Sequence, residues 1–133
     1  MHGAMDIVSA LFAENINLRQ VPGPSTRIDL SGIMFSTPAP APPPVTIQPH
    51  LIVLVRSRPQ DSGQGILEVV FTDGNGEEVA RNVSPFNVEP GKFTYRLVRG
   101  ELTFKDYSTI EANCRLLPDG VVTTVPLTLI PSP

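Results

Sequence analysis

The segment Asp73-Gly74-Asn75-Gly76-Glu77-Glu78 offers carboxylate and amide oxygens, which are the ligands that calcium prefers in proteins. A calcium loop of the EF-hand type needs glycine at its sixth position, where this segment has Glu78. Such a loop also lies between helices, whereas the sequence on both sides of this one alternates like β-strands. We therefore expect no metal here and interpret the segment as a solvated hairpin tip.

A histidine base, a carboxylate and a serine are the elements of a hydrolytic triad. The candidates in this chain are His50, Asp29 or Glu14, and Ser31 or Ser9. Neither serine lies in the strand-to-helix turn that exposes a catalytic nucleophile, and both histidines stand at the start of a strand or of the chain. We predict no catalytic residues and no enzymatic activity, and an enzyme with an unrecognised carboxylate site is the least favoured interpretation.

Cys114 is the single cysteine, so the chain forms no internal disulfide, and two histidines are too few for a Cys/His metal site. We interpret Cys114 as a small buried apolar residue. Gly63 and Gly65 do not form a phosphate loop, because neither a lysine nor a helix follows them. The sequence therefore predicts no cofactor.

The charge of the chain is low, with a net charge of -3 and 17% charged residues. Binding of nucleic acid needs a basic face, which leaves only a local patch of Arg96, Arg99 and Lys105 to consider, and we expect these strand residues to be solvated separately. No apolar run approaches the ~20 residues of a membrane span. We expect a cytoplasmic protein without nucleic-acid or membrane partners, and a thinly charged surface that a protein partner partly covers.

The segment from Ile66 to Val83 is the clearest structural signal, because two alternating apolar runs flank an Asp-Gly-Asn-Gly turn. A type I turn followed by Gly76 in the left-handed conformation makes a three-residue hairpin loop. The cross-strand pairs expected in that register are Phe71 with Val79 and Leu67 with Val83. We expect Phe71 to be buried between two sheets.

Further short apolar or alternating runs, separated by proline and glycine turns, predict more strands. They cover Met5–Ala13, Thr26–Phe35, His50–Arg58, Phe93–Val98, Leu102–Phe104, Thr109–Leu116 and Val121–Ile130. With about eight strands, the fold class is all-β: an antiparallel β-sandwich of the immunoglobulin-like, Greek-key type. One domain spans residues 1–133; residues 1–4 are either an addition before a natural start at Met5 or disordered.

Residues 37–44, Thr-Pro-Ala-Pro-Ala-Pro-Pro-Pro, form a proline-rich connection. Because proline fixes φ and lacks a donor, this segment is extended or irregular. Pro40 and Pro43 match the PxxP pattern of SH3-type ligands, but no basic residue flanks them closely. We therefore interpret the segment as a stiff link between the two sheets.

The strand His50–Arg58 is apolar on both faces, and a single sandwich has only one core. One of its two faces must therefore be covered by something else, either the proline-rich segment or a second protein surface. The candidate interface residues are Ile52, Leu54 and Arg56. We favour a two-fold homodimer that uses this face.

Several segments together resemble an uncharacterised family of small bacterial proteins, a domain of unknown function. They are Leu11–Glu14, Ile28–Gly32, the proline-rich passage, Leu51–Val55 and Phe71–Gly76. The resemblance covers most of the chain from Met5 and implies a β-sandwich of bacterial origin, without any activity. A weaker similarity is to sandwich modules of phage or injection machinery.

These observations favour a non-enzymatic β-sandwich that binds another protein or itself. The alternative is a structural or decorating subunit of a larger bacterial or phage assembly. A flat apolar patch on the surface would favour the binding module, whereas a cleft of carboxylates with shifted pKa values would favour an enzyme.

Overall fold

The computed structural model describes residues 5–23, 25–118 and 120–133, and the regular elements in these ranges are all β-strands. Within these ranges there is no helix long and apolar enough to cross a membrane. The expectation about residues 1–4 lies outside the described residues, as do Pro24 and Asp119 in two predicted turns.

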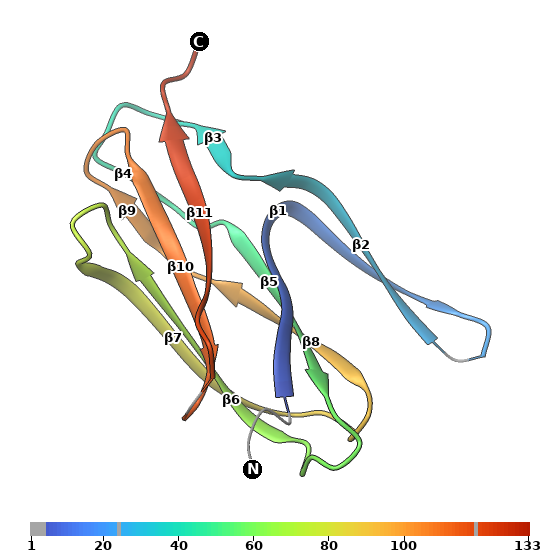
Figure 1. Cartoon of the computed structure of the whole chain (residues 1–133). Helices are drawn as coiled ribbons and strands as arrows, with labels where there is room; N and C mark the ends of the chain where they lie inside the picture. The colour runs from blue at the N-terminus through green and yellow to red at the C-terminus, as the bar shows by residue number, and fades with distance from the viewer. Residues whose placement is uncertain (1–4, 24, 119) are drawn as a thin grey trace.

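Two sheets form a sandwich, and a short two-stranded sheet lies beside them (Figure 1). Sheet A contains, in spatial order, β2 (Ser25–Met34), β1 (Met5–Val21), β5 (His50–Ser57) and β8 (Phe93–Arg99). Sheet B contains β3 (Ser36–Pro38), β11 (Thr123–Ile130), β10 (Thr109–Leu116), β6 (Gln64–Thr72) and β7 (Glu78–Asn87). The third sheet pairs β4 (Val45–Ile47) with β9 (Leu102–Phe104).

The predicted all-β, antiparallel sandwich is confirmed. Among the described strands, only β3 pairs in parallel, with β11. The described residues form eleven strands where about eight were predicted: the three-residue strands β3 and β4 were not predicted, and β9 is the predicted short run Leu102–Phe104. Thr37 and Pro38 belong to β3, so the proline-rich connection begins in sheet B before the chain passes through β4 to β5 in sheet A.

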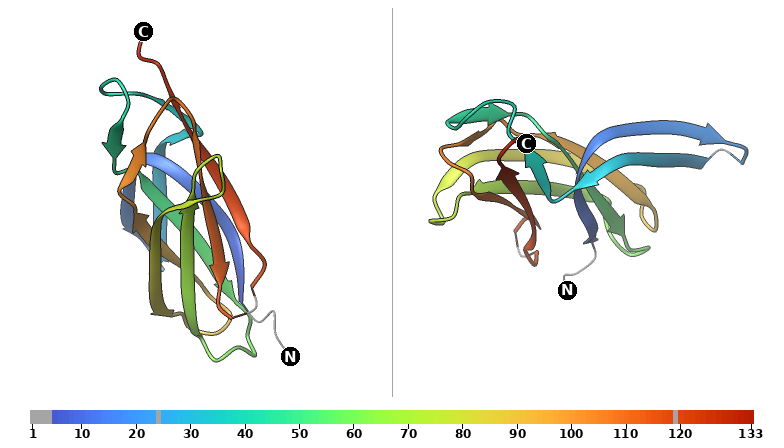
Figure 2. Two further views of the ribbon diagram at one scale, coloured as in Figure 1. Left: turned by 90° about the vertical axis from the view of Figure 1, so that its left-hand side faces the viewer. Right: turned by 90° about the horizontal axis from the view of Figure 1, so that it is seen from above.

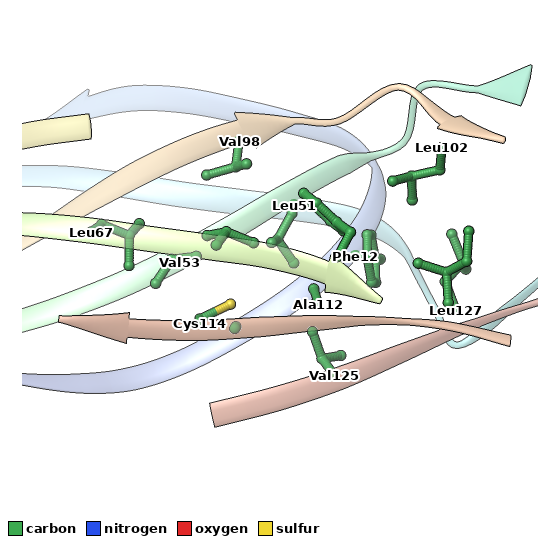
Figure 3. Packing of buried hydrophobic residues seen from close by; sticks show 14 of the residues in the cluster. Phe12, Leu51, Val53, Leu67, Val98, Leu102, Ala112, Cys114, Val125 and Leu127 are labelled. Atoms are coloured by element: carbon green, nitrogen blue, oxygen red, sulfur yellow. The ribbon is translucent and has the colours of Figure 1, made fainter. Parts of the chain in front are cut away.

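The core lies between the inner faces of sheets A and B (Figure 3). Leu51 and Val53 of β5 point toward the residues of sheet B, among them Leu67. Phe71 and Cys114 are buried in this core, at 1% and 0% exposure, which confirms both predictions. Burial raises the pKa of the Cys114 thiol to about 12, so the sulfur is protonated and unreactive at neutral pH.

The hairpin between β6 and β7 has the predicted turn. Gly76 has φ +79°, its N–H donates to the Asp73 carbonyl oxygen at 3.0 Å, and the Asp73 N–H donates to the Glu77 carbonyl oxygen at 2.9 Å. The predicted cross-strand pairs are wrong. A β-bulge next to Thr72 inserts one residue into β7, and the observed pairs are Phe71 with Ala80 and Leu67 with Ser84.

This shift by one residue reverses the faces along β7. Val83 therefore lies on the outer face of sheet B, where it is 50% exposed, instead of facing Leu67 in the core. Phe71 and Leu67 keep their predicted burial because the bulge changes the register of β7 and leaves β6 unchanged.

Strand β1 is much longer than the predicted segment Met5–Ala13. Its first part, from Met5 to Ala13, pairs with β5, and its second part, from Phe12 to Val21, pairs with β2. Beyond the sandwich, the β1–β2 hairpin projects away from the body as a two-stranded extension (Figures 1 and 2). We call residues 14–23 and 25–32 the arm.

Candidate functional site

Strand β5 has apolar side chains on both faces, as predicted. The inward residues belong to the core: Leu51, Val53 and Val55. The outward residues are the three predicted interface residues: Ile52, Leu54 and Arg56. The structure therefore places all three on the outer face of sheet A.

The register with β1 and β8 adds further side chains to this face. Leu11, Ile52 and Leu97 form one cross-strand row, and Ser9, Leu54 and Tyr95 form the next. We call the apolar and aromatic members of these rows the outer patch: Leu11, Ile52, Leu54, Tyr95 and Leu97. Cross-strand neighbours of this kind lie about 4.5–5.5 Å apart at Cβ, so the five side chains form a continuous apolar surface.

Exposure rises from the middle of the outer patch to the edge strand β8. Ile52 is 1% exposed on the central strand, Leu97 is 51% exposed on β8, and Phe93 at the start of β8 is 64% exposed. The apolar surface that a partner could reach is therefore concentrated on β8, on one side of Ile52.

An ion-pair cluster lies at one end of the outer patch. The Asp6 carboxylate accepts from the Arg56 guanidinium at 2.9 Å and from Arg58 at 3.1 Å. The hydrogen bond from Arg56 is the main cause of the lowered pKa of Asp6. Arg56, the predicted interface residue, thus already has an ion-pair partner within the chain, which it shares with Arg58.

His50 and Arg99 lie at the opposite end of the outer patch. Arg99 Nη2 contacts His50 Nε2, and His50 Nδ1 lies 3.3 Å from the carbonyl oxygen of Glu14. Because the guanidinium can only donate, Nε2 is the acceptor, and the ring proton on Nδ1 is donated to Glu14. Both ring nitrogens are therefore engaged.

The residues considered for a triad are not brought together. His50 is engaged with Arg99 and the Glu14 carbonyl oxygen, whereas Asp29 forms an ion pair with Arg19 on the arm, with 2.7 Å between Arg19 Nε and Asp29 Oδ2. Ser9 lies beside Leu54 in its row, and Ser31 lies on the arm opposite Asn15. This arrangement provides no base within reach of a serine.

The outer face of sheet B carries a polar network that the sequence analysis missed. Glu68 is mostly buried, and its carboxylate accepts from Arg81 at 2.7 Å and from Arg115 at 2.9 Å. Next to it, the Asn113 amide donates to the carbonyl oxygen of Val70, and its own oxygen accepts from a hydroxyl of β11. The alternating polar residues Glu111, Asn113 and Arg115 along β10 were the available signal, but the pairing with β6 became visible only with the register.

At the hairpin tip, the Asp73 carboxylate accepts hydrogen bonds from the backbone of its own turn. The Oδ1 atom of Asp73 accepts the backbone N–H of Asn75 at 2.9 Å and that of Glu77 at 3.0 Å, which closes the turn. In the part of the chain that the structure describes, no three or more His, Cys, Asp or Glu side chains are grouped so that they could hold a metal ion.

Arg96, Arg99 and Lys105, the candidates for a local basic patch, do not lie together on one face. Arg96 pairs with Val53, an inward residue, whereas Arg99 pairs with His50 on the outer face, so the two point to opposite sides of β8. Lys105 lies beyond β9. An inward-pointing charge such as Arg96 on an edge strand also opposes pairing of that edge with another strand.

A shallow hollow of about 450 Å³ lies where β6 begins and β7 ends. Its lining consists of Gln64, Gly65, Ile66, Pro85, Phe86, Asn87 and Leu117. No titratable side chain is among these residues, so the hollow itself provides no acid or base.

No family model and no curated protein matches this chain. Among solved structures, the chain is similar to a member of glycosyl hydrolase family 2 from Bacteroides cellulosilyticus DSM 14838, with 18% sequence identity and a TM-score of 0.55. The similarity covers 67% of this chain and 14% of the hydrolase chain. It shows the fold alone: an all-β domain that resembles a region of that hydrolase. The bacterial family suggested by the sequence stays a prediction.

Proposed function

We propose that this chain is a non-enzymatic protein-interaction module that binds a second copy of itself through the outer patch. The observation that carries the proposal is the continuous apolar surface of β1, β5 and β8 on the side of sheet A that faces away from the core. Exposed contiguous apolar surfaces on soluble proteins mark contact sites.

The surroundings of the outer patch have the composition of a protein interface. Charged residues are absent from its two central rows and stand at its ends. At those ends Asp6 is paired with Arg56 and Arg58, and Arg99 contacts His50. The two central rows contain no charged side chain, so a partner that covers only this apolar centre buries no charge.

A second copy is the occupant that we favour. A patch that extends across three strands can meet itself across a two-fold axis, and two-fold dimers are the commonest oligomers of soluble proteins. The low share of charged residues, 17%, agrees with a chain that buries part of its surface in an assembly.

The acidic side chains give little support to the enzyme interpretation. Asp6, Asp29 and Glu68 each lie in ion pairs with arginine. For Asp6, the hydrogen bond from Arg56 lowers the pKa. A general acid at neutral pH needs the opposite environment, in which burial without a partner raises the pKa.

The test compares two matched substitutions on edge strands. Leu97→Glu places a charge in the outer patch, whereas Val83→Glu places the same charge on the outer face of sheet B; the two side chains are 51% and 50% exposed. We expect Leu97→Glu to weaken self-association by about tenfold or more, because it buries a carboxylate in an apolar contact. Val83→Glu should leave association unchanged.

Light scattering over a dilution series measures the association of all three proteins. A wild-type protein that stays monomeric at high micromolar concentration would refute the proposal, as would equal association of the two variants. Leu97 is a better probe than Ile52, since Ile52 is 1% exposed and Ile52→Asp puts the stability of the monomer at risk as well.

The alternative function, a structural subunit of a larger bacterial or phage assembly, requires more than one contact surface on each chain. The arm favours it, because it is a projection that the sandwich does not need for its own core.

A further inference from the structure

The arm has one apolar and one polar face. On the apolar face, Ile16 pairs with Leu30 and Leu18 pairs with Ile28, so four aliphatic side chains form two adjacent rows. Three consecutive rows of the opposite face are polar: Asn15 with Ser31, Asn17 with Asp29, and Arg19 with Arg27. This alternation is typical of a sheet with one covered and one solvated face.

The apolar face of the arm continues the inner face of sheet A. Phe12 and Met34 form the row at the base of the hairpin, and both pack in the core. Further out, the arm extends past the edge of sheet B, as the view from above shows (Figure 2). Leu18 is accordingly 41% exposed. The arm is one layer of a sandwich without its second layer.

We infer that the arm of a second copy supplies this second layer. In this contact, two arms lie face to face across a two-fold axis and run in opposite directions, so the tip of one lies over the base of the other. The inference concerns a different surface from the outer patch and does not rest on the proposed function. A lone two-stranded hairpin is marginally stable in water, and mutual coverage by a second apolar layer removes that weakness.

The order of the rows makes the arm complementary to itself in this arrangement. From base to tip, the β1 residues on the apolar face are Glu14, Ile16, Leu18 and Gln20. Reversal places Ile16 over the partner's Leu18 and Glu14 over the partner's Gln20. Aliphatic side chains thus meet aliphatic side chains, and a carboxylate meets an amide that can donate to it.

The charges oppose the alternative in which both arms run in the same direction. That arrangement brings Glu14 close to the partner's Glu14, and like charges that face each other are destabilising. Glu14 lies over Gly32, which has φ +69° and where a Cβ would overlap the carboxylate, so the side chain is held against this face. The ion pair of Arg19 with Asp29 lies on the other face and is not disturbed.

The first experiment compares neighbouring residues on the two faces of the arm. Leu18→Asp places a carboxylate on the apolar face, and Asn17→Asp places the same group on the polar face one residue earlier. We expect Leu18→Asp to raise the dissociation constant of the arm contact by about tenfold or more and Asn17→Asp to leave it unchanged. Equal sedimentation behaviour of the two variants would refute the inference.

The combination with Leu97→Glu separates this contact from the outer patch. If both contacts exist, each single variant retains one contact and sediments as a dimer, and the double variant Leu18→Asp/Leu97→Glu sediments as a monomer. A Leu97→Glu protein that is already monomeric would refute the arm contact and leave the outer patch intact. A Leu18→Asp protein that is already monomeric would refute the outer patch and support the arm.

The second experiment tests the direction of the arms by disulfide trapping. A mixture of Ile16→Cys and Leu18→Cys chains should crosslink under mild oxidation, because these positions face each other, whereas each variant alone should crosslink much less. Asn17→Cys mixed with either is the matched control for random collision. Cys114 is fully buried and does not compete. Crosslinking no stronger than the Asn17→Cys control would refute the arrangement even if Leu18→Asp disturbs the arm.

Discussion

The outer faces of sheets A and B have similar strand backbones but carry side chains of different chemistry. On sheet B, Glu68 binds Arg81 and Arg115, so that side chains satisfy one another across three strands. On sheet A, the corresponding central positions carry Ile52 and Leu54, and charged groups stand only at the ends. Both faces have an edge strand with a half-exposed aliphatic residue, Val83 on β7 and Leu97 on β8.

The difference shows that the presence of polar residues on a strand face does not by itself decide whether that face needs a partner. What decides it is whether the polar groups already have hydrogen-bond partners within the sheet. The outer face of sheet B needs no partner, because most of its polar groups already have one within the sheet. The centre of the outer face of sheet A is mainly apolar, with only the hydroxyl groups of Ser9 and Tyr95 among its two rows, and water is a poor environment for its aliphatic side chains. Exposed fractions alone do not distinguish the two faces; the chemistry of the neighbouring rows does.

The largest expected effect on stability comes from the core beneath sheet B, which both sheets share. Phe71→Ala should lower the free energy of unfolding by about 3–5 kcal/mol, because it removes a fully buried ring and leaves a cavity. Chemical denaturation followed by fluorescence or circular dichroism measures the change. A loss below about 1 kcal/mol would contradict the inward orientation of β6 and with it the assignment of both outer faces.

An intermediate effect is expected from the centre of the polar network. Glu68→Ala leaves Arg81 and Arg115 without their shared carboxylate, and we expect a loss of roughly 1–2 kcal/mol, since both guanidinium groups are about half exposed. The double substitution with Arg115→Ala should cost less than the sum of the single ones. Additive losses in this double-mutant cycle would mean that the network does not act as a unit.

The smallest effect concerns the ion pairs at the end of the outer patch. Because the folded-state pKa of Asp6 lies below its ordinary value, its stabilising contribution is fully present above the ordinary pKa and is lost as the pH falls through the folded pKa. Wild-type protein should therefore lose slightly more stability than Asp6→Asn between neutral and acidic pH. Parallel stability curves for the two proteins would contradict a contribution from Arg56 and Arg58.

The fold was largely predictable because its strongest signals are local. The Asp-Gly-Asn-Gly turn, the glycine at position 76 and the inward alternation of β10 each depend on a few adjacent residues. The register of β7 was not predictable in the same way, since the bulge beside Thr72 has no distinctive residue type and is decided by packing between strands.

The arm was missed although its pattern is in the sequence. Ile16 and Leu18 on one side of the Val21-Pro22-Gly23 turn mirror Ile28 and Leu30 on the other. The first strand was predicted to end at Ala13, before residues 14–20, which are mainly polar apart from Ile16 and Leu18. Only the structure shows that this hairpin leaves the core, where such residues are acceptable. The alternation along β5 that separates Ile52, Leu54 and Arg56 from Leu51, Val53 and Val55 is observed, because β5 has no bulge within that stretch.

The continuity of β1 has a mechanical consequence. This one strand of 17 residues is hydrogen-bonded to β2 in the arm and to β5 in the sandwich, with no loop between the two parts. A pull along the arm therefore reaches the β1–β5 ladder directly and loads its hydrogen bonds in shear, all together. A pull across the sheet instead opens the same ladder one bond at a time. The domain should resist force best when its arm is drawn along its own axis.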